Sequence, residues 1–296
     1  MELTNILDTN NRNRLKSIPV KKIGKTTVNK SENGVCFLTF DSLSKAGVVH
    51  GFSTREGGVS SGIYKSMNLS FMRGDEYENV RDNHRLFAEA VGYNCEDTVF
   101  SDQVHDTRIA YVTEKDKGLG MHGEKGLEGM DGLVTDIPGI PLMTFYADCV
   151  PLLFYDPVKR VIASSHSGWR GTVAGMGRIT TEYLCNNMGC KRENIIAVIG
   201  PSICMDCYEV SEDVASCFLD AFAAKNHDEI LRDKHNGKYQ LNLWEANRII
   251  LENAGLKKEN ISMPDICTCH NPDIMISHRQ TGGKRGNMAA VIMLLI

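Results

Sequence analysis

No apolar run in this sequence of 296 residues approaches the roughly 20 residues needed to cross a bilayer, and the longest, at 289–296, has the length of a strand. Residues 1–22 contain no apolar stretch of the length found in signal peptides. Neither sign of charge is in excess, since the formal net charge is −4. Such a balance does not indicate a nucleic-acid or membrane-surface partner. We therefore expect a cytoplasmic protein that binds neither nucleic acid nor a membrane.

The sequence also contains no H-x-H pair among its 9 histidines, no internal repeat and no long Pro- or Ser-rich linker. A four-copper oxidase centre requires many histidines, usually as H-x-H pairs, so such a centre is not expected here. The sequence contains 10 cysteines. In a long chain without an export signal they are expected to be reduced thiols that pack in the core, bind metal or take part in catalysis.

The chain divides into two parts by composition. Residues 1–35 are polar and have little periodicity, which predicts a flexible N-terminal extension. Residues 36–296 are predicted to form a single catalytic domain. Strand-like runs occur at 36–40, 108–112, 132–136, 141–147, 151–156, 161–166 and 195–200. Helical spacing of apolar residues occurs at 78–92, 173–189, 211–222 and 242–255. We expect a mixed α/β or α+β fold, a layered sandwich of mixed β-sheets flanked by helices.

Three predicted strands, at 141–147, 151–156 and 161–166, follow one another with only turns between them. Parallel strands need a long crossover, whereas antiparallel neighbours need only a tight turn. The spacing therefore predicts consecutive antiparallel hairpins and argues against a simple repeated βαβ arrangement.

Three candidate metal ligands lie at the expected ends of strands, in the segments Q-V-H, A-D-C and H-S-G-W-R-G. They are His105, Cys149 and His166. Two imidazoles and a thiolate are strong ligands for Zn²⁺, and three protein ligands leave a fourth position for water or substrate, as in catalytic zinc sites. The separations along the chain are not a known zinc spacing, and a single His or Cys is more often structural.

Several polar residues near these segments are candidates for catalysis or substrate binding. Arg170 lies in a glycine-rich turn before a helix, where it could bind phosphate, although it could equally form a structural ion pair. Arg55 lies in a second glycine-rich loop that could be an ordinary surface turn. The basic loop 278–286 could close over a phosphate or form only a hairpin turn. The C-x-C-H run ending at His270 is expected to pack rather than bind metal, because its spacing is not that of a zinc site.

Many segments match one family in order. They are GFSTREGGVS, MNLS, QVH, DGLVT, ADCVPLLFYD, HSGWRGTV, GPSIC with CYEV, LNLWEAN, and CTCHNPDIMISHR with GGK. Over residues 45–296 the chain thereby resembles the YfiH family, also called the laccase-domain or polyphenol oxidase family. The resemblance implies an α/β sandwich, zinc bound by His105, Cys149 and His166, and an enzyme that acts on purine nucleosides and phosphate. The oligomeric state stays open, and we favour a monomer.

The activity implied by the resemblance is phosphorolysis of adenosine, inosine and S-methyl-5′-thioadenosine, together with deamination of adenosine. In this interpretation Cys149, His166, Asp148 and Arg170 are catalytic. The substrate-binding residues are Arg55, Gln103, Arg170 and Arg279. The sequence departs from the family pattern in the last loop, where Gln280 and Asn287 replace arginines. If those arginines bind substrate, specificity or rate will differ, and Arg285 lies close enough to compensate.

Three other functions stay open at this stage. The family name implies copper-dependent oxidation of polyphenols, and Cu²⁺ binds such ligands more tightly than Zn²⁺ in vitro. An amide hydrolase that edits peptidoglycan precursors is a second alternative, either zinc-dependent or, without metal, with Cys149 as the nucleophile and His166 or His105 as its base. A non-enzymatic binding module with structural zinc is the last alternative, and the open fourth position argues against it.

Overall fold

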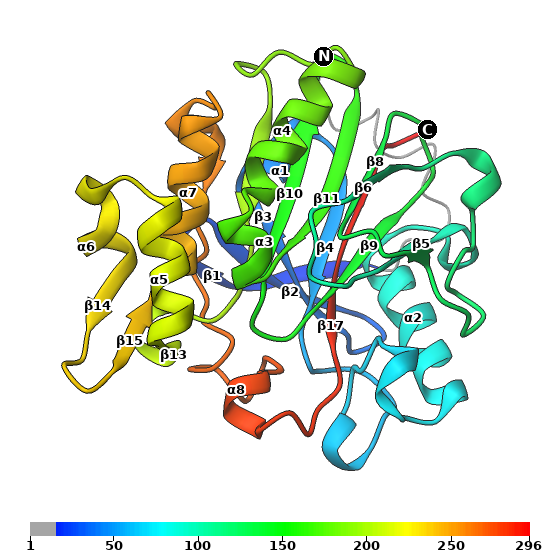
Figure 1. The fold of residues 1–296 in the computed structure, drawn as a ribbon. Coiled ribbons are helices and arrows are strands. Elements are labelled where there is room, and N and C mark those ends of the chain that lie inside the picture. Colours follow the sequence, from blue (N-terminus) through cyan, green and yellow to red (C-terminus); the bar gives the residue numbers. More distant parts are fainter. Residues whose placement is uncertain (1–15) are drawn as a thin grey trace.

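The computed structural model describes residues 16–296, which form two large sheets, one small sheet and the helices around them (Figure 1). The first sheet is mixed and has eight strands in the order β1 (Ser17–Ile23), β2 (Thr26–Ser31), β3 (Cys36–Phe40), β4 (Val49–Ser53), β17 (Met288–Met293), β9 (Leu142–Tyr146), β5 (Val99–Asp102) and β7 (Leu127–Glu128). The second, also mixed, has six in the order β16 (Ile261–Ser262), β12 (Ile196–Ile199), β10 (Val150–Asp156), β11 (Val161–Ser167), β8 (Gly132–Thr135) and β6 (Ile109–Tyr111). The third has β13 (Glu209–Ser211), β15 (Lys238–Leu241) and β14 (Leu231–Asp233).

The helices cover the outer faces of the two large sheets. α2 (Tyr77–Val91) packs on the first sheet, whereas α3 (Trp169–Val173), α4 (Met176–Asn187), α5 (Glu212–Ala221) and α7 (Leu243–Asn253) lie on the side of the second (Figure 1). The short helices are α1 (Asp41–Ala46), α6 (His227–Ile230) and α8 (His278–Thr281). No helix in residues 16–296 combines the length and apolar character needed to span a membrane.

The core has three layers because the central strands bury both faces. In β10, Leu153 joins the cluster between the two large sheets, whereas Leu152 and Phe154 join the cluster under the helices. In β17, Ala290 faces the first of these clusters and Val291 faces the cluster under α2. Each large sheet is therefore apolar on both sides, which explains the continuous apolar runs in these strands. The predicted layered sandwich of mixed sheets flanked by helices is confirmed.

The predicted strands and helices occur within a few residues of their expected ends, with one interruption. The helix expected at 173–189 is broken by Gly175, which has φ +80° and separates α3 from α4. Residues 17–31, assigned to the extension, include β1 and β2, which extend the first sheet by antiparallel pairing onto β3. Alternate side chains of β2, Thr26 and Val28, are buried. The rest of the predicted extension, residues 1–15, lies outside the described residues.

The prediction of consecutive hairpins is wrong for β9 and β10. β10 and β11 do pair as an antiparallel hairpin, but β9 belongs to the first sheet and β10 to the second. The chain passes between the sheets at residues 147–149, where Asp148 has φ +87°. A short turn can therefore join strands of two stacked sheets as well as neighbours within one sheet. This crossing point carries the Cys149 side chain.

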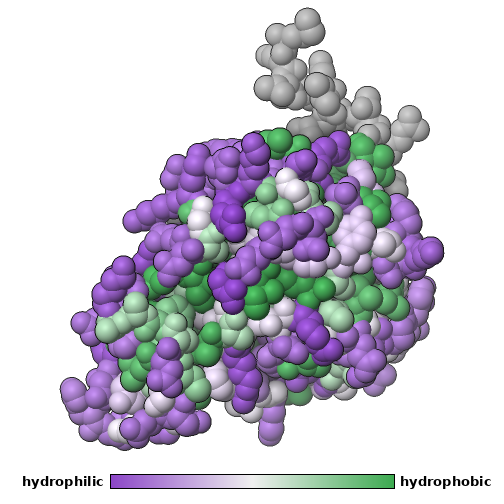
Figure 2. All heavy atoms as spheres, turned by 45° about the horizontal axis from the view of Figure 1, so that its top comes forward, coloured by the Kyte–Doolittle hydropathy of each residue, from purple (hydrophilic) through white to green (hydrophobic). Residues whose placement is uncertain are grey.

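The molecular surface seen in Figure 2 is largely hydrophilic, with smaller apolar areas between charged and polar side chains. Apolar areas of this kind are usual on folded proteins. The site is identified from the arrangement of individual side chains.

Candidate active site

Three predicted ligands converge where the two large sheets meet. His105 follows β5, Cys149 precedes β10, and His166 lies near the end of β11. Their potential ligand atoms all lie within 4.8 Å of one another. The two imidazole rings are nearly perpendicular, with centroids 4.8 Å apart. Residues that are separated in the sequence thus form one compact group with the donor chemistry of a zinc site.

Asp131 holds this group in place through hydrogen bonds, although it was not among the site residues predicted from the sequence. Its fully buried carboxylate accepts a hydrogen bond from Nδ1 of His166 at 2.7 Å. It also accepts hydrogen bonds from the backbone N–H groups of Val104, His105 and Asp106, at 2.9, 3.1 and 3.1 Å. One side chain therefore orients the His166 ring and fixes the loop that carries His105. The pairing leaves Nε2 of His166 for a metal, an arrangement typical of metal-binding histidines.

The electrostatics of the group are set by burial and by close charges. Burial alone would raise the pKa of Asp131, but the hydrogen bonds from His166 and the backbone amides hold that pKa below its usual value. Burial, together with the charge of His166, lowers the pKa of His105. For His166, burial opposes the charged form, but Cys149 and Asp131 outweigh it and raise the pKa to about 9. A protonated His166 therefore lies beside the Cys149 side chain in the metal-free group.

The loop geometry around the group is close-fitting. His105 has φ +62°, a left-handed conformation that costs roughly 1–3 kcal/mol unless the surroundings enforce it. The hydrogen bonds to Asp131 provide that enforcement. Gly168 begins α3, and a Cβ atom there would lie 2.8 Å from Nδ1 of His105 and 3.1 Å from Sγ of Cys149. Only glycine leaves room for both ligands at this position.

A cavity opens on one side of the group and has two kinds of wall. The His105, Cys149 and His166 side chains line it together with three phenylalanines, Phe71, Phe100 and Phe145. The Phe100 and Phe145 rings meet edge to face, with centroids 5.0 Å apart. An aromatic wall of this kind can hold a flat heterocycle beside the metal ligands.

The same cavity contains a pair of arginines that the sequence analysis did not assign to the site. Arg73 donates to the Asn287 side-chain oxygen at 3.1 Å, and Arg285 donates to the same oxygen. Arg285 is only 8% exposed, and its Nε atom has no hydrogen-bond partner in the described residues. Burial and the charge of Arg73 lower the pKa of Arg285 to about 10. Neither arginine has a carboxylate within 4.0 Å in residues 16–296. The pair therefore places two positive charges in the cavity without a direct ion pair in the described residues.

Two of the other predicted site residues have structural contacts close to the group. Gln103 lines the cavity, but its amide is used to join β9: it donates to the Phe145 carbonyl at 2.9 Å and accepts from the Phe145 N–H at 2.7 Å. Asp148 accepts hydrogen bonds from Thr268, Ser277 and the Arg279 N–H, at 2.6, 3.0 and 2.7 Å. Its carboxylate thereby anchors the turn that carries Cys149 to the C-terminal segment.

The three predicted arginines lie outside the cavity. Arg170 is exposed and lies over the Trp169 ring, 4.2 Å from its centroid. Arg279 donates to the Glu209 carbonyl at 2.8 Å and lies over the Tyr208 ring, 5.2 Å from its centroid. Arg55 donates to the carbonyls of Lys65 and Pro272 in a different part of the molecule. Arg55 is thus not brought together with the other candidates.

Two residues of the C-terminal C-x-C-H run, Cys267 and His270, lie in a second group of candidate metal ligands. Cys267 and His270 lie beside Cys204 and Cys207, with all four ligand atoms within 4.8 Å of one another. The expectation that the C-x-C-H run packs without binding metal is not supported by this arrangement, because two further cysteines from a distant segment complete the group. The signal that could have revealed the group is the pair of spacings C-x-x-C and C-x-x-H, which are zinc-type spacings.

Comparison with known proteins gives one family and a consistent set of relatives. Residues 49–295 match the family described as "Multi-copper polyphenol oxidoreductase laccase". A protein of Bacillus subtilis named "Purine nucleoside phosphorylase YlmD" is 38% identical over 248 residues, which cover 83% of this chain and 88% of that protein. "Adenosine deaminase RL5" from an unknown prokaryotic organism is 35% identical, with coverages of 80% and 91%.

Solved structures agree with the sequence matches. The crystal structure of YlmD from Geobacillus stearothermophilus is similar with a TM-score of 0.84 and 32% identity, covering 88% of this chain and 96% of that one. The YfiH protein of Bacillus licheniformis gives a TM-score of 0.83 and 33% identity, with coverages of 87% and 96%. The likeness therefore extends over nearly the whole of both relatives.

Proposed function

This chain is an enzyme of the laccase-domain or YfiH family, and we propose that it is a zinc-dependent purine nucleoside phosphorylase with adenosine deaminase activity. Its proposed substrates are adenosine, inosine and S-methyl-5′-thioadenosine. The observation that carries the proposal is the single cavity that combines metal ligands, an aromatic wall and two arginines that have no ion-pair partner in the described residues. These are the groups needed for a metal, a purine and a phosphate.

The purine is assigned to the aromatic wall. Phe71, Phe100 and Phe145 offer apolar faces and edges next to His105. Stacking of a base on an aromatic side chain contributes about 1–3 kcal/mol and tolerates different bases. Such a wall suits an enzyme that accepts both adenine and hypoxanthine nucleosides.

Phosphate is assigned to Arg73 and Arg285. Arg285 is buried and has a free Nε donor, and the repulsion between the two guanidinium groups is relieved when an anion lies between them. Arg170 was the phosphate ligand predicted from the sequence, and that role stays a prediction. The two assignments differ in a measurable way, because Arg170 is exposed and outside the cavity whereas Arg285 lines it.

Zinc is assigned to His105, Cys149 and His166. The fit is supported by the donor set, by the Asp131 hydrogen bond that orients His166, and by the space that Gly168 leaves for the ligands. A zinc ion held there supplies a Lewis acid beside the bound purine. Asp131 keeps His166 in the orientation that ligation needs, and Asp148 keeps the Cys149 turn in place through its contacts with residues 268–279.

The proposed phosphorolysis exchanges one bond for another. An oxygen of phosphate forms a bond to C1′ of the ribose while the bond from C1′ to the purine nitrogen breaks, and the purine leaves with the electron pair of that bond. The arginine pair positions the phosphate and the aromatic wall positions the purine. Holding both reactants in one cavity contributes to the rate by removing the entropic cost of their encounter.

Product analysis with adenosine tests the proposal. Purified protein of known metal content is incubated with adenosine, with and without phosphate, and the products are separated by chromatography. We expect adenine only when phosphate is present, and inosine in both conditions. Both products should disappear in Cys149→Ala. Zinc-loaded protein that forms neither product would contradict the proposal.

Substitution of single arginines locates the phosphate. Arg285→Gln is expected to raise the KM for phosphate by about 10-fold or more, the effect of losing a charged hydrogen bond worth about 1.5–3 kcal/mol. Arg170→Gln serves as the matched control and should leave that KM unchanged. The opposite result would return the phosphate to Arg170.

A second candidate function is supported by the Cys149–His166 pair. A cysteine beside a histidine is the arrangement of many cysteine nucleophiles and their bases, so an amide hydrolase acting on peptidoglycan precursors is the alternative. Metal removal separates the two functions, because the hydrolase would keep its activity after treatment with a chelator and the phosphorylase would lose it. Copper-dependent polyphenol oxidation, named in the family description, is tested by the same preparation loaded with Cu²⁺.

A further inference from the structure

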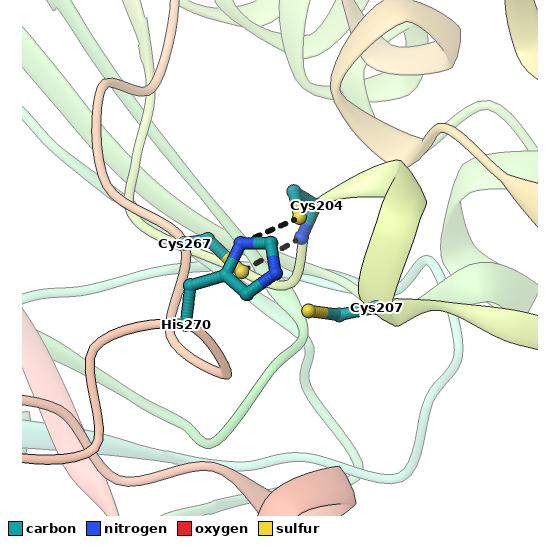
Figure 3. A group of neighbouring side chains, drawn as sticks. All are labelled: Cys204, Cys207, Cys267 and His270. Carbon is teal, nitrogen blue, oxygen red and sulfur yellow. Dashed lines mark hydrogen bonds between the residues drawn. The ribbon is translucent and has the colours of Figure 1, made fainter.

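The second group of metal-binding side chains, Cys204, Cys207, Cys267 and His270, lies outside the proposed active site. Cys204 precedes a short 3₁₀ turn (Met205–Cys207) that follows the G-P-S-I segment, and Cys207 ends this turn. Cys267 and His270 begin and end another turn, in the segment between β16 and α8. Figure 3 shows the four side chains pointing toward one another from these two segments. Each segment thus contributes two ligand atoms from one turn, as in the C-x-x-C and C-x-x-H units of zinc sites.

The distances within the group fit a tetrahedral metal ion. All four ligand atoms lie within 4.8 Å of one another, and Sγ of Cys204 is 3.5 Å from Nδ1 of His270. Zn–S bonds of about 2.3 Å place tetrahedral sulfur ligands about 3.8 Å apart, so the group needs to contract by no more than about 1 Å. Cys267 is buried and His270 is exposed, which leaves an entry path from solvent.

The backbone around the group already provides the supporting contacts of a metal site. The Cys204 N–H donates to Sγ of Cys267 at 3.3 Å (Figure 3). The two segments are joined by an isolated bridge between Ser202 and Cys267 and by a hydrogen bond from the Thr268 N–H to the Ser202 carbonyl at 3.1 Å. Backbone N–H groups that bind the ligand sulfur, and a fixed approach of the two ligand pairs, are the outer contacts that stabilise bound metals.

We propose that Cys204, Cys207, Cys267 and His270 bind a second zinc ion with a structural role. Four protein ligands close the coordination sphere, unlike the three-ligand group of the active site. Three thiolates and one imidazole favour zinc over the hard cations, which take oxygen ligands. This inference does not depend on the proposed phosphorylase activity.

The position of the second ion gives it a role in supporting the active site. It joins the turn at 204–207 to the segment at 267–270. Within the second segment Thr268 donates to Asp148, the neighbour of Cys149. Tyr208, which follows Cys207, lies under the Arg279 guanidinium. Loss of the ion is therefore expected to loosen the anchor of the Cys149 turn and to lower the melting temperature of the whole protein.

Zinc stoichiometry of the full chain tests the proposal. We expect two zinc ions per chain in the wild type, one in Cys207→Ser, one in Cys149→Ala, and none in the double variant. Cys217→Ser is the matched control, because this partly buried thiol lies on α5 and contacts only the Asp213 carbonyl among the described hydrogen bonds. It should keep two. If Cys207→Ser does not fold, His270→Ala at the exposed ligand provides the same comparison.

Cobalt substitution of the wild type gives a measurement that needs no variant. Co²⁺ at three thiolates should produce a thiolate-to-cobalt charge-transfer band much stronger than that of the single thiolate of the active site.

Two outcomes would overturn the proposal. One is a wild-type protein with a single zinc that is lost in Cys149→Ala. The other is a disulfide between any two of Cys204, Cys207 and Cys267 in the protein as purified under reducing conditions. One zinc that is lost in Cys207→Ser but kept in Cys149→Ala would support the second site and contradict the active-site zinc.

Discussion

Gly168 provides a sharp test of the geometry of the active site. In Gly168→Ala the new Cβ would lie 2.8 Å from Nδ1 of His105 and 3.1 Å from Sγ of Cys149. Non-bonded carbon contacts are optimal at about 3.5 Å or more, so the His105 ring must move by about 0.7 Å or rotate away. Metal–ligand distances tolerate errors of only about 0.2 Å. The substitution should therefore disturb two of the three ligands together.

We expect Gly168→Ala to weaken zinc binding at the three-ligand site by at least about 10–100-fold, the range found when the orientation of metal ligands is disturbed. The fold itself should survive, because φ at this position is −69°, which alanine readily adopts. Zinc affinity is measured by competition with a chelator of known affinity. Circular dichroism and the melting temperature of the metal-free proteins show whether the variant is folded.

Gly171→Ala is the matched control from the same segment. The nearest atom to a Cβ at Gly171 is the His166 carbonyl oxygen at 3.4 Å, an ordinary contact. Because Gly171 lies within α3, alanine should leave zinc affinity unchanged and stabilise the helix by up to about 1 kcal/mol. Equal zinc affinity in Gly168→Ala, Gly171→Ala and wild type would refute the proposed ligand arrangement.

Two other substitutions test the hydrogen bonds of Asp131 and the burial of His84. Asp131→Asn keeps the size of the side chain but replaces one acceptor oxygen by a donor, so the His166 ring and the 104–106 loop lose their common partner. Zinc affinity should therefore fall about 10–100-fold in the chelator assay. An unchanged affinity would exclude the orienting role of Asp131. His84 is fully buried, and burial lowers its pKa from 6.5 to about 4. At pH values between these two, the unfolded chain binds a proton at His84 and the folded chain does not. Stability should therefore fall as the pH drops from 6.5 toward 4, and His84 should contribute about 2 kcal/mol of the loss between about pH 7 and about pH 4.5. Urea unfolding of wild type and His84→Gln measures this difference, and identical pH profiles would contradict the lowered pKa.

The layers and the three principal ligands could be predicted because their signals are local. β10 is buried on both faces and appears in the sequence as an apolar run, and α2 and α7 show helical spacing of apolar residues. The match of many segments to one family in order placed His105, Cys149 and His166 together. The structure confirms that their ligand atoms are close.

The crossing between sheets and the supporting residues could not be predicted because they depend on distant contacts. The left-handed conformation of Asp148, which carries the chain from one sheet to the other, has no signal in the residues around it. Asp131 lies 35 residues from His166 and 26 from His105, and only the fold brings its carboxylate to both. Arg73 and Arg285 likewise approach each other only through β17 and the loop before α2.

The second group of ligands was missed for a different reason. Cys204 and Cys267 are 63 residues apart, but each belongs to a pair with standard zinc spacing. The run at 267–270 taken as C-x-C-H does not have a zinc spacing, and only the fold shows that Cys267 and His270 face a second pair. The cytoplasmic location, the monomeric state and the division at residue 35 stay predictions.

The most direct test of the proposed activity is the identity of the phosphorus-containing product. Zinc-loaded protein is incubated with inosine and phosphate and followed by ³¹P NMR, with Cys149→Ala as the control. The account predicts that a sugar phosphate, ribose 1-phosphate, appears in step with hypoxanthine in the wild type and not in the variant. Hypoxanthine without a sugar phosphate would mean hydrolysis, and no product from folded, zinc-loaded protein would contradict the account.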